Sequence, residues 1–492
     1  MVVSDMWHIL FSAENRRRLN TAMICRPSGH HQLSRVSPKI TKIVIEALND
    51  EFDLEFDLKG DHCILVGPNG VGKSTALQVI AHALGRKWSL LSDQRFKAIE
   101  IQWGEDFARI SKSECEAYSF NMRGGFVQNL EKRLRARGEI ERFLEADLTS
   151  SSERRYFATP PVPQSSLFAL QRKLRAAEGE EDSESSVDNF INLLDRKNVP
   201  RTIFLPTSRR IEVELAKISE GMPEFLSEKI TEYFEDRSSS KYFEEIVRFG
   251  MEDIENIIRQ FELSAQAESR NKFNFLMANL LKEMANGKSI SVRDVRERNL
   301  TEEEIRRVLS RIEEGVLSST ERSKIVDTIT SLSSPQAGGG NPAFHKKWLA
   351  HFFVRLQEAD VELSEFETPM LRFVEAIQKY MTPKEVRYDI ETSKFSMTAP
   401  SGRPIELSEL SSGEKQLTAM IAMLEFSQER TNVFIDEPEL SLSVLWQTSI
   451  LTDIVGARSC QQLFAVTHSP FVFENTLETH VIDFADCLVP HG

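Results

Sequence analysis

The stretch "ILVGPNGVGKSTALQVIAHAL", residues 64–84, constrains the fold of this chain more than any other. It reads as an apolar strand, a glycine-rich turn and a helix with apolar residues at Leu77, Ile80, Ala81 and Leu84. The turn fits G-x-x-x-x-G-K-[ST] and lies between a strand and a helix, which is the context that this motif requires. Glycines let backbone N–H groups turn inward around an anion, and the helix points its positive end at the same anion. The sequence therefore predicts a phosphate-binding loop.

The residues of this loop predict a binding site for a nucleoside triphosphate. Lys73 is expected to reach the β- and γ-phosphates, and the Ser74 hydroxyl is expected to ligate Mg²⁺. The other nucleotide-binding positions are expected along the same turn: Asn69, Gly70, Gly72 and Thr75. The predicted ligands are thus a nucleoside triphosphate and Mg²⁺.

An acidic motif, "TNVFIDEPELSLSVLWQ", supplies the second half of the site 363 residues after Lys73. Its apolar run, residues 433–435, ends in Asp436 and Glu437, and a buried strand brings such carboxylates to the carboxyl edge of a parallel sheet. Asp436 is expected to hold Mg²⁺, and Glu437 to orient and deprotonate the attacking water. The alternative, an acidic helix N-terminus that only complements the macrodipole, is disfavoured once the phosphate loop is counted.

Two further segments add anion contacts. "LSELSSGEKQLTAMIAML", residues 407–424, places Ser412 and Gly413 at the start of an apolar helix, where backbone donors and the positive helix end face an anion. "LFAVTHSPFVF", residues 463–473, reads as a buried strand that ends in Thr467, His468 and Ser469. A lone histidine is more often structural than catalytic. At a strand end, 31 residues after the acidic pair, His468 is nevertheless placed to bond a γ-phosphate.

Together these segments resemble the ABC-type ATPases of the structural-maintenance, recombination-repair and overcoming-lysogenization group. The motifs that carry the resemblance stand here as "GPNGVGKST", "LSSGEKQ", "FIDEPELSL" and "VTHSP", in the family's order. The resemblance implies an α/β P-loop fold of ABC-ATPase type, with a mixed sheet and helices on both faces. It also implies that the nucleotide is ATP, which the chain hydrolyses to ADP and phosphate with Glu437 and His468 as catalytic residues.

The same resemblance implies a shared site between subunits. In this reading Ser412, Gly413 and Glu414 contact ATP bound by another copy, so that two nucleotides are sandwiched in a dimer or higher homo-oligomer. Ser441 and Leu442 look like the loop that couples the two sites.

Three positions depart from the family's pattern or match it only in part. Ser443 stands where relatives often have histidine, so it is assigned no role. The glutamine that usually links the metal site to the inserted arm has three candidates: Gln102, Gln128 and Gln164. "RTIFLPTSRRIE", residues 201–212, looks like a strand and turn of prokaryotic members; a place for Arg209 or Arg210 near nucleotide or an interface and a surface salt bridge are equally favoured.

The expected domain organisation follows from the spacing of these motifs. A capping box at Thr301 and Glu304 opens one of the helices between the two ATPase halves. Breaks at "RSSSK" and "SSPQAGGGNP" predict a compact helical insertion and not a long coiled-coil arm. The predicted parts are a basic, disordered extension, the N-terminal half of the ATPase head, the helical insertion and the C-terminal half of the head, at residues 1–38, 39–210, 211–382 and 383–492.

Composition limits the partners. A net charge of −14 argues against a surface that wraps nucleic acid as a whole. In residues 108–163 a solvated helix face is preferred over a nucleic-acid contact for the basic side chains: Lys132, Arg133, Arg135, Arg137 and Arg142. No apolar run is long enough to span a membrane, and the five cysteines form no C-x-x-C pair. A cytoplasmic protein with no membrane partner is therefore expected.

The chain is expected to act through another protein. Only about two dozen residues follow the T-H-S strand, too few for the nuclease domain that overcoming-lysogenization proteins carry there. This organisation resembles the ATPase subunits of prokaryotic anti-phage systems such as PARIS and Septu, between which the motifs do not choose. The leading hypothesis is an ATP-switched sensor and scaffold that controls a separate effector nuclease, triggered by a phage protein or nucleic acid. The alternatives are a DNA-repair ATPase that binds DNA ends and, less favoured, a transporter motor.

Overall fold

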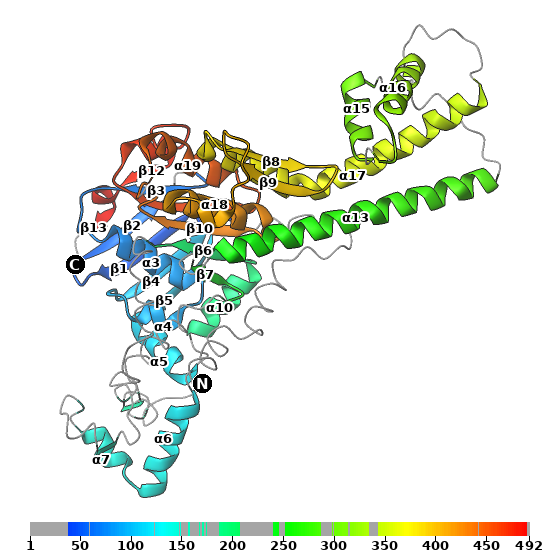
Figure 1. Cartoon of the computed structure of the whole chain (residues 1–492). Helices are drawn as coiled ribbons and strands as arrows, with labels where there is room; N and C mark the ends of the chain where they lie inside the picture. The colour runs from blue at the N-terminus through cyan, green and yellow to red at the C-terminus, as the bar shows by residue number, and fades with distance from the viewer. Residues whose placement is uncertain are drawn as a thin grey trace. The chain divides into compact units, whose positions relative to one another are not determined.

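The computed structural model divides the chain into two compact units (Figure 1). The head unit takes in the described residues of Leu33–Arg248 and Glu429–Gly492, and the arm unit takes in those of Phe249–Gln428. The structure describes residues 38–58, 60–122, 124–146, 148, 156–157, 167, 170–171, 174, 186–206, 240–245, 251–286, 298, 300–312, 315–333, 343–440 and 442–489.

Six parallel strands form the main sheet of the head, in the order β12-β3-β11-β10-β6-β7. Every residue of the neighbouring strands β10 and β11 is buried, as expected where both faces of a parallel sheet are covered. The register pairs Val66 with Thr467 and Asp436 with Val466, so β3, β10 and β11 end at one edge. The strands are β3 Cys63–Val66, β6 Arg201–Leu205, β7 Phe243–Glu245, β10 Thr431–Asp436, β11 Cys460–Thr467 and β12 Val481–Asp483.

A second sheet of the head is antiparallel, in the order β13-β2-β1-β4-β5. Helix α3, Lys73–Leu84, shares one hydrophobic core with both sheets, to which Ile45, Leu65 and Leu77 contribute. The predicted fold class is confirmed, with the strands divided between a parallel and an antiparallel sheet. The strands of the second sheet are β1 Lys42–Leu48, β2 Phe52–Asp57, β4 Ala98–Trp103, β5 Asp106–Ser111 and β13 Leu488–Val489.

A small separate core lies in the segment between β5 and β6. It joins α6, Gly124–Arg137, and α7, Ile140–Glu145, to leucines as far as Leu174. Gln171 donates from Nε2 to the carbonyls of Phe143, Leu144 and Ala146 at 2.8 to 3.1 Å, which satisfies the free carbonyl end of α7. The other helices and turns of the head are α4 Trp88–Ser92, α5 Lys112–Met122, α10 Ser186–Arg196, α19 Val444–Gly456, η3 Pro470–Val472, η4 Glu478–His480 and η5 Phe484–Cys487.

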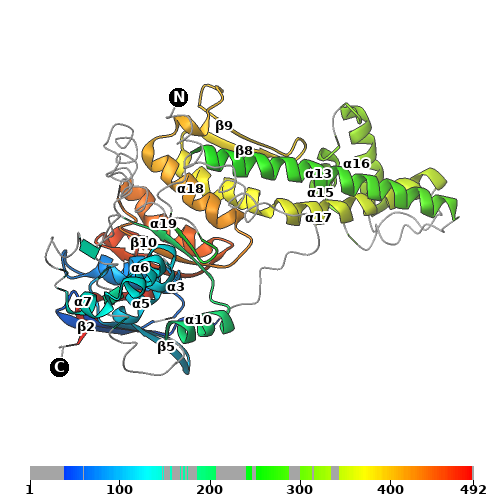
Figure 2. The ribbon, with the colours of Figure 1, turned by 90° about the horizontal axis from the view of Figure 1, so that it is seen from below.

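Two long antiparallel helices dominate the arm unit, α13 at Met251–Ala285 and α17 at Phe344–Met381 (Figures 1 and 2). Their pairing is marked by Lys272 with Glu362, and by His351 Nε2, which lies 2.6 Å from Glu283 Oε2. At about 1.5 Å per residue each helix is roughly 50 Å long or more. The prediction of a compact insertion without a long arm is therefore wrong.

The physical reason for this error lies in where the breaks fall. "RSSSK" and "SSPQAGGGNP" flank the two helices and interrupt neither of them. Within α13 the buried apolar residues Ile254, Ile258, Phe261 and Ala265 are spaced by four, three and four, which is typical of a seam between two helices.

Two short helices, α15 at Glu302–Ser310 and α16 at Ser319–Ser333, pack against the distal parts of α13 and α17 in a common apolar core. The predicted capping box is confirmed, because Thr301 Oγ1 accepts from the N–H of Glu304 and the Glu304 carboxylate accepts from the N–H of Thr301. The apolar face of α15 is buried, as the sequence pattern indicated.

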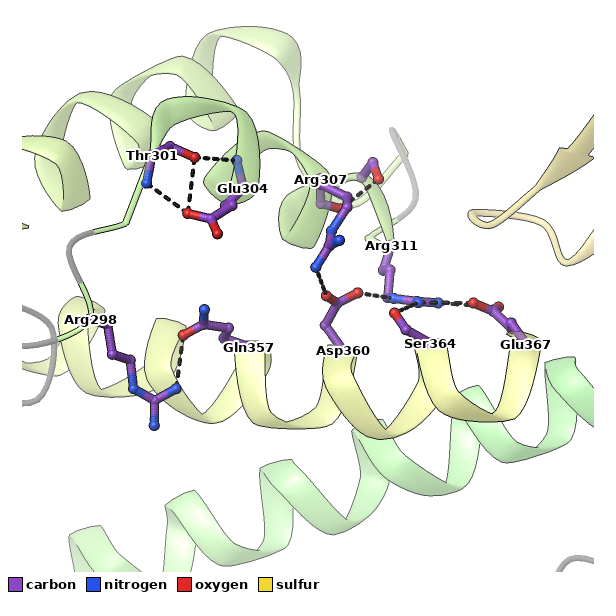
Figure 3. A network of polar contacts seen from close by, with 10 residues as sticks. Arg298, Thr301, Glu304, Arg307, Arg311, Gln357, Asp360, Ser364 and Glu367 are labelled. Atoms are coloured by element: carbon purple, nitrogen blue, oxygen red, sulfur yellow. Dashed lines mark hydrogen bonds and ion pairs between the residues drawn. The ribbon is translucent and has the colours of Figure 1, made fainter. Parts of the chain in front are cut away.

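A buried network of charges fixes α15 to α17 (Figure 3). The Arg311 side chain points from the end of α15 between Asp360 and Glu367, and its hydrogen bonds reach both carboxylates at 2.5 to 3.2 Å. It also donates to Ser364 Oγ at 3.1 Å, and Arg307 adds a bond of 3.0 Å to Asp360. The three central side chains are only 1 to 3% exposed, so water contributes little to their solvation.

The segment after α17 completes the arm unit with a hairpin and a buried helix. Tyr388 of the hairpin donates to Glu367 at 3.3 Å, and Arg372 of α17 bonds Glu425 of α18 at 3.1 Å. Residues 407–424, the signature segment, which we expected in the C-terminal half of the head, thus pack with the long helices. The elements are β8 Glu385–Asp389, β9 Lys394–Thr398, η2 Leu407–Glu409 and α18 Ser412–Phe426.

Three further features considered in the sequence analysis can be compared with the structure. No helix in the described ranges combines the length and the apolar character needed to cross a bilayer. Four of the five cysteines are described, and all are buried free thiols: Cys63, Cys115, Cys460 and Cys487. The basic extension predicted at residues 1–38 falls almost wholly outside the described residues.

Candidate functional site

The phosphate loop connects β3 to α3 and depends on two glycines with left-handed backbone. Gly70 has a φ of 83° and Gly72 a φ of 96°, a region that side-chain-bearing residues rarely adopt. A Cβ at Gly72 would also lie 2.8 Å from Asn49 Nδ2. Gly72 is the N-cap of α3 and no side chain caps this helix, so its first-turn N–H groups face the loop without a side-chain acceptor.

Lys73 folds back over this loop. Its side-chain Nζ donates to the carbonyl oxygens of Gly67 at 2.9 Å and Pro68 at 2.6 Å. Burial lowers the pKa of Lys73, while the charges of Asp436 and Glu437 act to raise it. The ammonium is thus held at the mouth of the loop, close to the acidic pair.

The two predicted metal ligands meet across the sheet. Ser74 Oγ donates to Asp436 Oδ1 at 2.9 Å, although 362 residues separate them. This contact follows from the parallel register, because β11 lies between β3 and β10 and all three end at the same edge. A hydroxyl and a carboxylate oxygen are hard ligands of the kind that Mg²⁺ prefers, so the donor set fits this ion.

Glu437 follows Asp436 in an unusual backbone conformation. Its φ is 49°, the left-handed region, and its N–H donates to the carbonyl of Val466 at 2.9 Å. Burial raises the pKa of the Glu437 carboxyl, and the charges of Asp436 and Glu439 raise it further. A half-buried carboxyl with a raised pKa at a backbone outlier is typical of a general base.

His468 completes this edge of the sheet. It is exposed at the end of β11, and its charge, like that of Lys73, acts to lower the pKa of Glu437. Both side chains are therefore within electrostatic reach of the base. The head thus brings together five predicted site residues: Lys73, Ser74, Asp436, Glu437 and His468.

The other predicted residues of the head lie on or next to the phosphate loop, in other elements of the head, or outside the described residues. Asn69 and Gly70 are exposed, and Thr75 is half-buried in the first turn of α3. Gln102 donates to Glu100 along β4, in the antiparallel sheet. Ser443 is the N-cap of α19. The residues on which the structure gives no side-chain description are Gln128, Gln164, Arg209, Arg210 and Ser441.

The signature segment lies in the arm unit and forms the first turn of α18. Ser411 is its N-cap and accepts from the N–H of Glu414, whose carboxylate accepts from the N–H of Ser411. The same carboxylate pairs with Lys384, so Glu414 is engaged inside its own unit. Ser412 is exposed and Gly413 is buried at this helix end. Their contact with a neighbour's nucleotide stays a prediction.

Sequence reasoning missed two polar residues at the acidic edge. Glu439, two residues after Glu437, bonds the T-H-S turn, and Gln447 of α19 bonds the same turn. The sequence did offer a hint for Glu439, which is the last residue of the motif "DEPE", residues 436–439. Its partner could be found only from the pairing of β10 with β11.

A family match decides the class of this site. The family described as "AAA domain, putative AbiEii toxin, Type IV TA system" matches residues 63–474, which is well over half of the chain. The chain belongs to this family. As a member of the AbiEii-type AAA family it is a P-loop ATPase of the AAA/ABC type.

Solved structures similar to this AbiEii-type AAA protein include three heads of Smc proteins. The Pyrococcus furiosus Smc head with an extended coiled coil, bound to the C-terminal domain of ScpA, has 11% identity, covers 90% of this chain and 93% of its own, and gives a TM-score of 0.35. An Smc head bound to the C-winged helix domain of ScpA has 10% identity, 91% and 94% coverage and a TM-score of 0.35. A Pyrococcus yayanosii Smc head has 12% identity, 90% and 94% coverage and a TM-score of 0.28. No curated protein matches the chain.

Proposed function

We propose that the chain binds ATP with Mg²⁺ and hydrolyses it to ADP and phosphate. The observation that carries this proposal is the hydrogen bond of 2.9 Å between Ser74 and Asp436, with Glu437 next to it. A phosphate loop, a metal site and a raised-pKa carboxyl are the parts that phosphoryl transfer to water needs.

Each side chain of the edge has a role in this reaction. Lys73 exchanges its bonds with the loop carbonyls for contacts to the β- and γ-phosphates. Ser74 and Asp436 would hold the metal ion, which when bound would supply neutralisation of the negative charge on the phosphates. Glu437 accepts the proton of the attacking water, and its raised pKa makes it a better proton acceptor at neutral pH than an ordinary carboxylate. His468 donates to the γ-phosphate.

Hydrolysis is proposed to occur in a homo-oligomer of at least two chains. Ser412 is exposed at the start of α18, where the helix end offers backbone donors to an anion. Ser412, Gly413 and Glu414 would complete the nucleotide site of a neighbouring copy, with Glu414 ordering the turn through its capping box.

A test of hydrolysis uses two variants of the full chain. We expect Glu437→Gln to bind a fluorescent ATP analogue as the wild type does but to lose about 10²-fold or more in kcat, because the base is deleted and its shape is kept. Lys73→Ala should lose binding itself. Phosphate release at the wild-type rate from Glu437→Gln would refute the assignment of the base.

The cellular role that we propose is that of a cytoplasmic sensor and scaffold in an anti-phage complex, where ATP controls a separate effector nuclease. The family's description supports this role, because it names a putative toxin of a Type IV toxin–antitoxin system. Tagged protein pulled down from its host should bring a nuclease with it, released on infection or on ATP turnover. A wild-type pull-down without any nuclease, in the presence and absence of ATP, would contradict this role.

One observation favours a second candidate, a repair ATPase that binds DNA ends. The paired helices α13 and α17 form a long arm in place of the compact insertion that the sequence predicted. Such an ATPase should hydrolyse ATP faster with linear DNA, and the stimulation should fall steeply between 50 and 200 mM salt. Hydrolysis unaffected by DNA would remove this candidate.

A further inference from the structure

Glu439 holds the turn that carries His468 with a single carboxylate. Its Oε1 accepts from the backbone N–H of His468 at 2.8 Å and from that of Ser469 at 3.2 Å. Its Oε2 accepts from the Thr467 hydroxyl at 2.8 Å. Thr467, His468 and Ser469 therefore all bond the side chain of Glu439. Glu439 lies two residues after the proposed base Glu437.

Gln447 of α19 adds a second tie to the same turn. Its Oε1 accepts from the Ser469 hydroxyl at 2.7 Å, and its Nε2 donates to the carbonyl of Leu442 at 3.1 Å. Leu442 belongs to the loop that follows β10. The amide of Gln447 thus connects that loop to the end of β11.

The loop itself is short and internally bonded. The N–H of Leu440 donates to the carbonyl of Glu437 at 3.1 Å, and the N–H of Leu442 donates to the carbonyl of Glu439 at 3.0 Å. Glu437 is therefore linked to Leu440, and Glu439, which bonds the T-H-S turn, is linked to Leu442.

We infer that Glu439 and Gln447 are positioning residues, which hold the backbone of His468 so that its imidazole faces the γ-phosphate on the same side as Glu437. The inference rests on the proposed hydrolysis of ATP. Neither side chain touches the nucleotide in this scheme. Both act through the T-H-S turn, and they make the turn and the loop after β10 move as one body.

Two substitutions of Glu439 can distinguish a role of its hydrogen bonds from a role of its negative charge. In Glu439→Gln the amide oxygen can still accept from both backbone N–H groups, and the amide NH₂ can donate to Thr467 Oγ1, since a hydroxyl also accepts. Glu439→Ala removes all three bonds. A role in positioning therefore predicts rescue by glutamine, and a role of the negative charge predicts none.

The kinetic test compares four variants of the full chain with the wild type. We expect Glu439→Ala to lower kcat about 10²-fold with the KM for ATP within about threefold, because a misplaced group costs rate and not binding. Glu439→Gln should keep kcat within about threefold, and Gln447→Ala should lower it about tenfold. Glu474→Ala, which removes an exposed carboxylate nearby, is the matched control and should change neither constant.

A second measurement does not depend on hydrolysis. In hydrogen exchange the amide of His468, bonded to a side chain and not to the backbone, should exchange at least tenfold faster in Glu439→Ala than in the wild type or in Glu439→Gln. This readout separates the inference from the proposed function, because it stands even if the wild type proves inactive. Unchanged exchange in Glu439→Ala would overturn the inference, as would a kcat equal to that of the Glu474→Ala control or a Glu439→Gln variant as slow as Glu439→Ala.

Discussion

Replacing Arg311 by methionine tests how much the buried network contributes to the arm unit. Arg311 is 3% exposed and makes hydrogen bonds to Asp360, Glu367 and Ser364. Without it, two carboxylates that are 1 and 3% exposed lose their central cation. Breaking a buried ion pair from one side typically costs about 3–5 kcal/mol.

The lower part of that range is expected here, because both carboxylates keep one partner. Arg307 still bonds Asp360 at 3.0 Å, and Tyr388 still donates to Glu367 at 3.3 Å. A loss of about 3 kcal/mol corresponds to more than a hundredfold change in an opening equilibrium.

Hydrogen exchange of α15 is the assay, since it reports local opening of the arm unit without unfolding of the head. The amides of Glu302–Ser310 should exchange about a hundredfold faster in Arg311→Met. The matched control is Arg306→Met, which removes an exposed ion pair with Glu302 and should cost less than about 0.5 kcal/mol. Equal exchange in the two variants would refute the reasoning.

A triple replacement guards against simple misfolding. Arg311→Met combined with Asp360→Leu and Glu367→Leu removes all the buried charge, and such replacements are often neutral or stabilising. We expect α15 to regain protection relative to Arg311→Met alone. Failure to regain it would mean that the site needs its polar geometry and not merely charge balance.

Three further predictions concern the nucleotide site. Because the base must be deprotonated and the pKa of Glu437 is raised, kcat should fall as pH falls through a value above the ordinary pKa of a glutamate side chain, and a pH–rate profile with its midpoint at or below that ordinary pKa would contradict this. Gly72→Ala should weaken ATP binding more than tenfold, measured by fluorescence titration, since its Cβ meets Asn49 in a left-handed backbone; binding within twofold of wild type would count against the loop geometry. Ser412→Arg should bind ATP without hydrolysing it and regain part of its activity when mixed with Lys73→Ala, whereas no rescue in exchanging oligomers would argue against a shared site.

The sequence predicted the side chains that meet at one edge of the head's parallel sheet, because local motifs mark them. The glycine pattern placed Lys73 and Ser74, and an apolar run ending in two acids placed Asp436 and Glu437. What joined them was the strand order, which puts β11 between β3 and β10. That order could be expected only from resemblance.

The contacts of Glu439 and the network of Arg311 were beyond the sequence. Glu439 reaches Thr467 across 28 residues and two paired strands, so no local pattern links them. Charged residues on a helix are usually solvated, and nothing in the spacing of Arg311, Asp360 and Glu367 marks them as buried. The two long helices could not be predicted because, in the sequence, a polar or glycine-rich stretch that precedes a long helix looks the same as one that interrupts it.

Pro369 gives α17 a mechanical property of its own. As a proline inside a helix it has no N–H for the carbonyl of Glu365, so the helix is most compliant there. The contacts with α15 end at Glu367 on one side, and the contact of Arg372 with α18 begins on the other. From Pro369 to Phe344 the helix runs about 38 Å, so a change in bend of about 10° at the proline would move its far end by about 7 Å. A bend at Pro369 would therefore have to carry α13 with it, because α13 pairs with α17 along this stretch through Phe261 on Phe366 and Lys272 with Glu362.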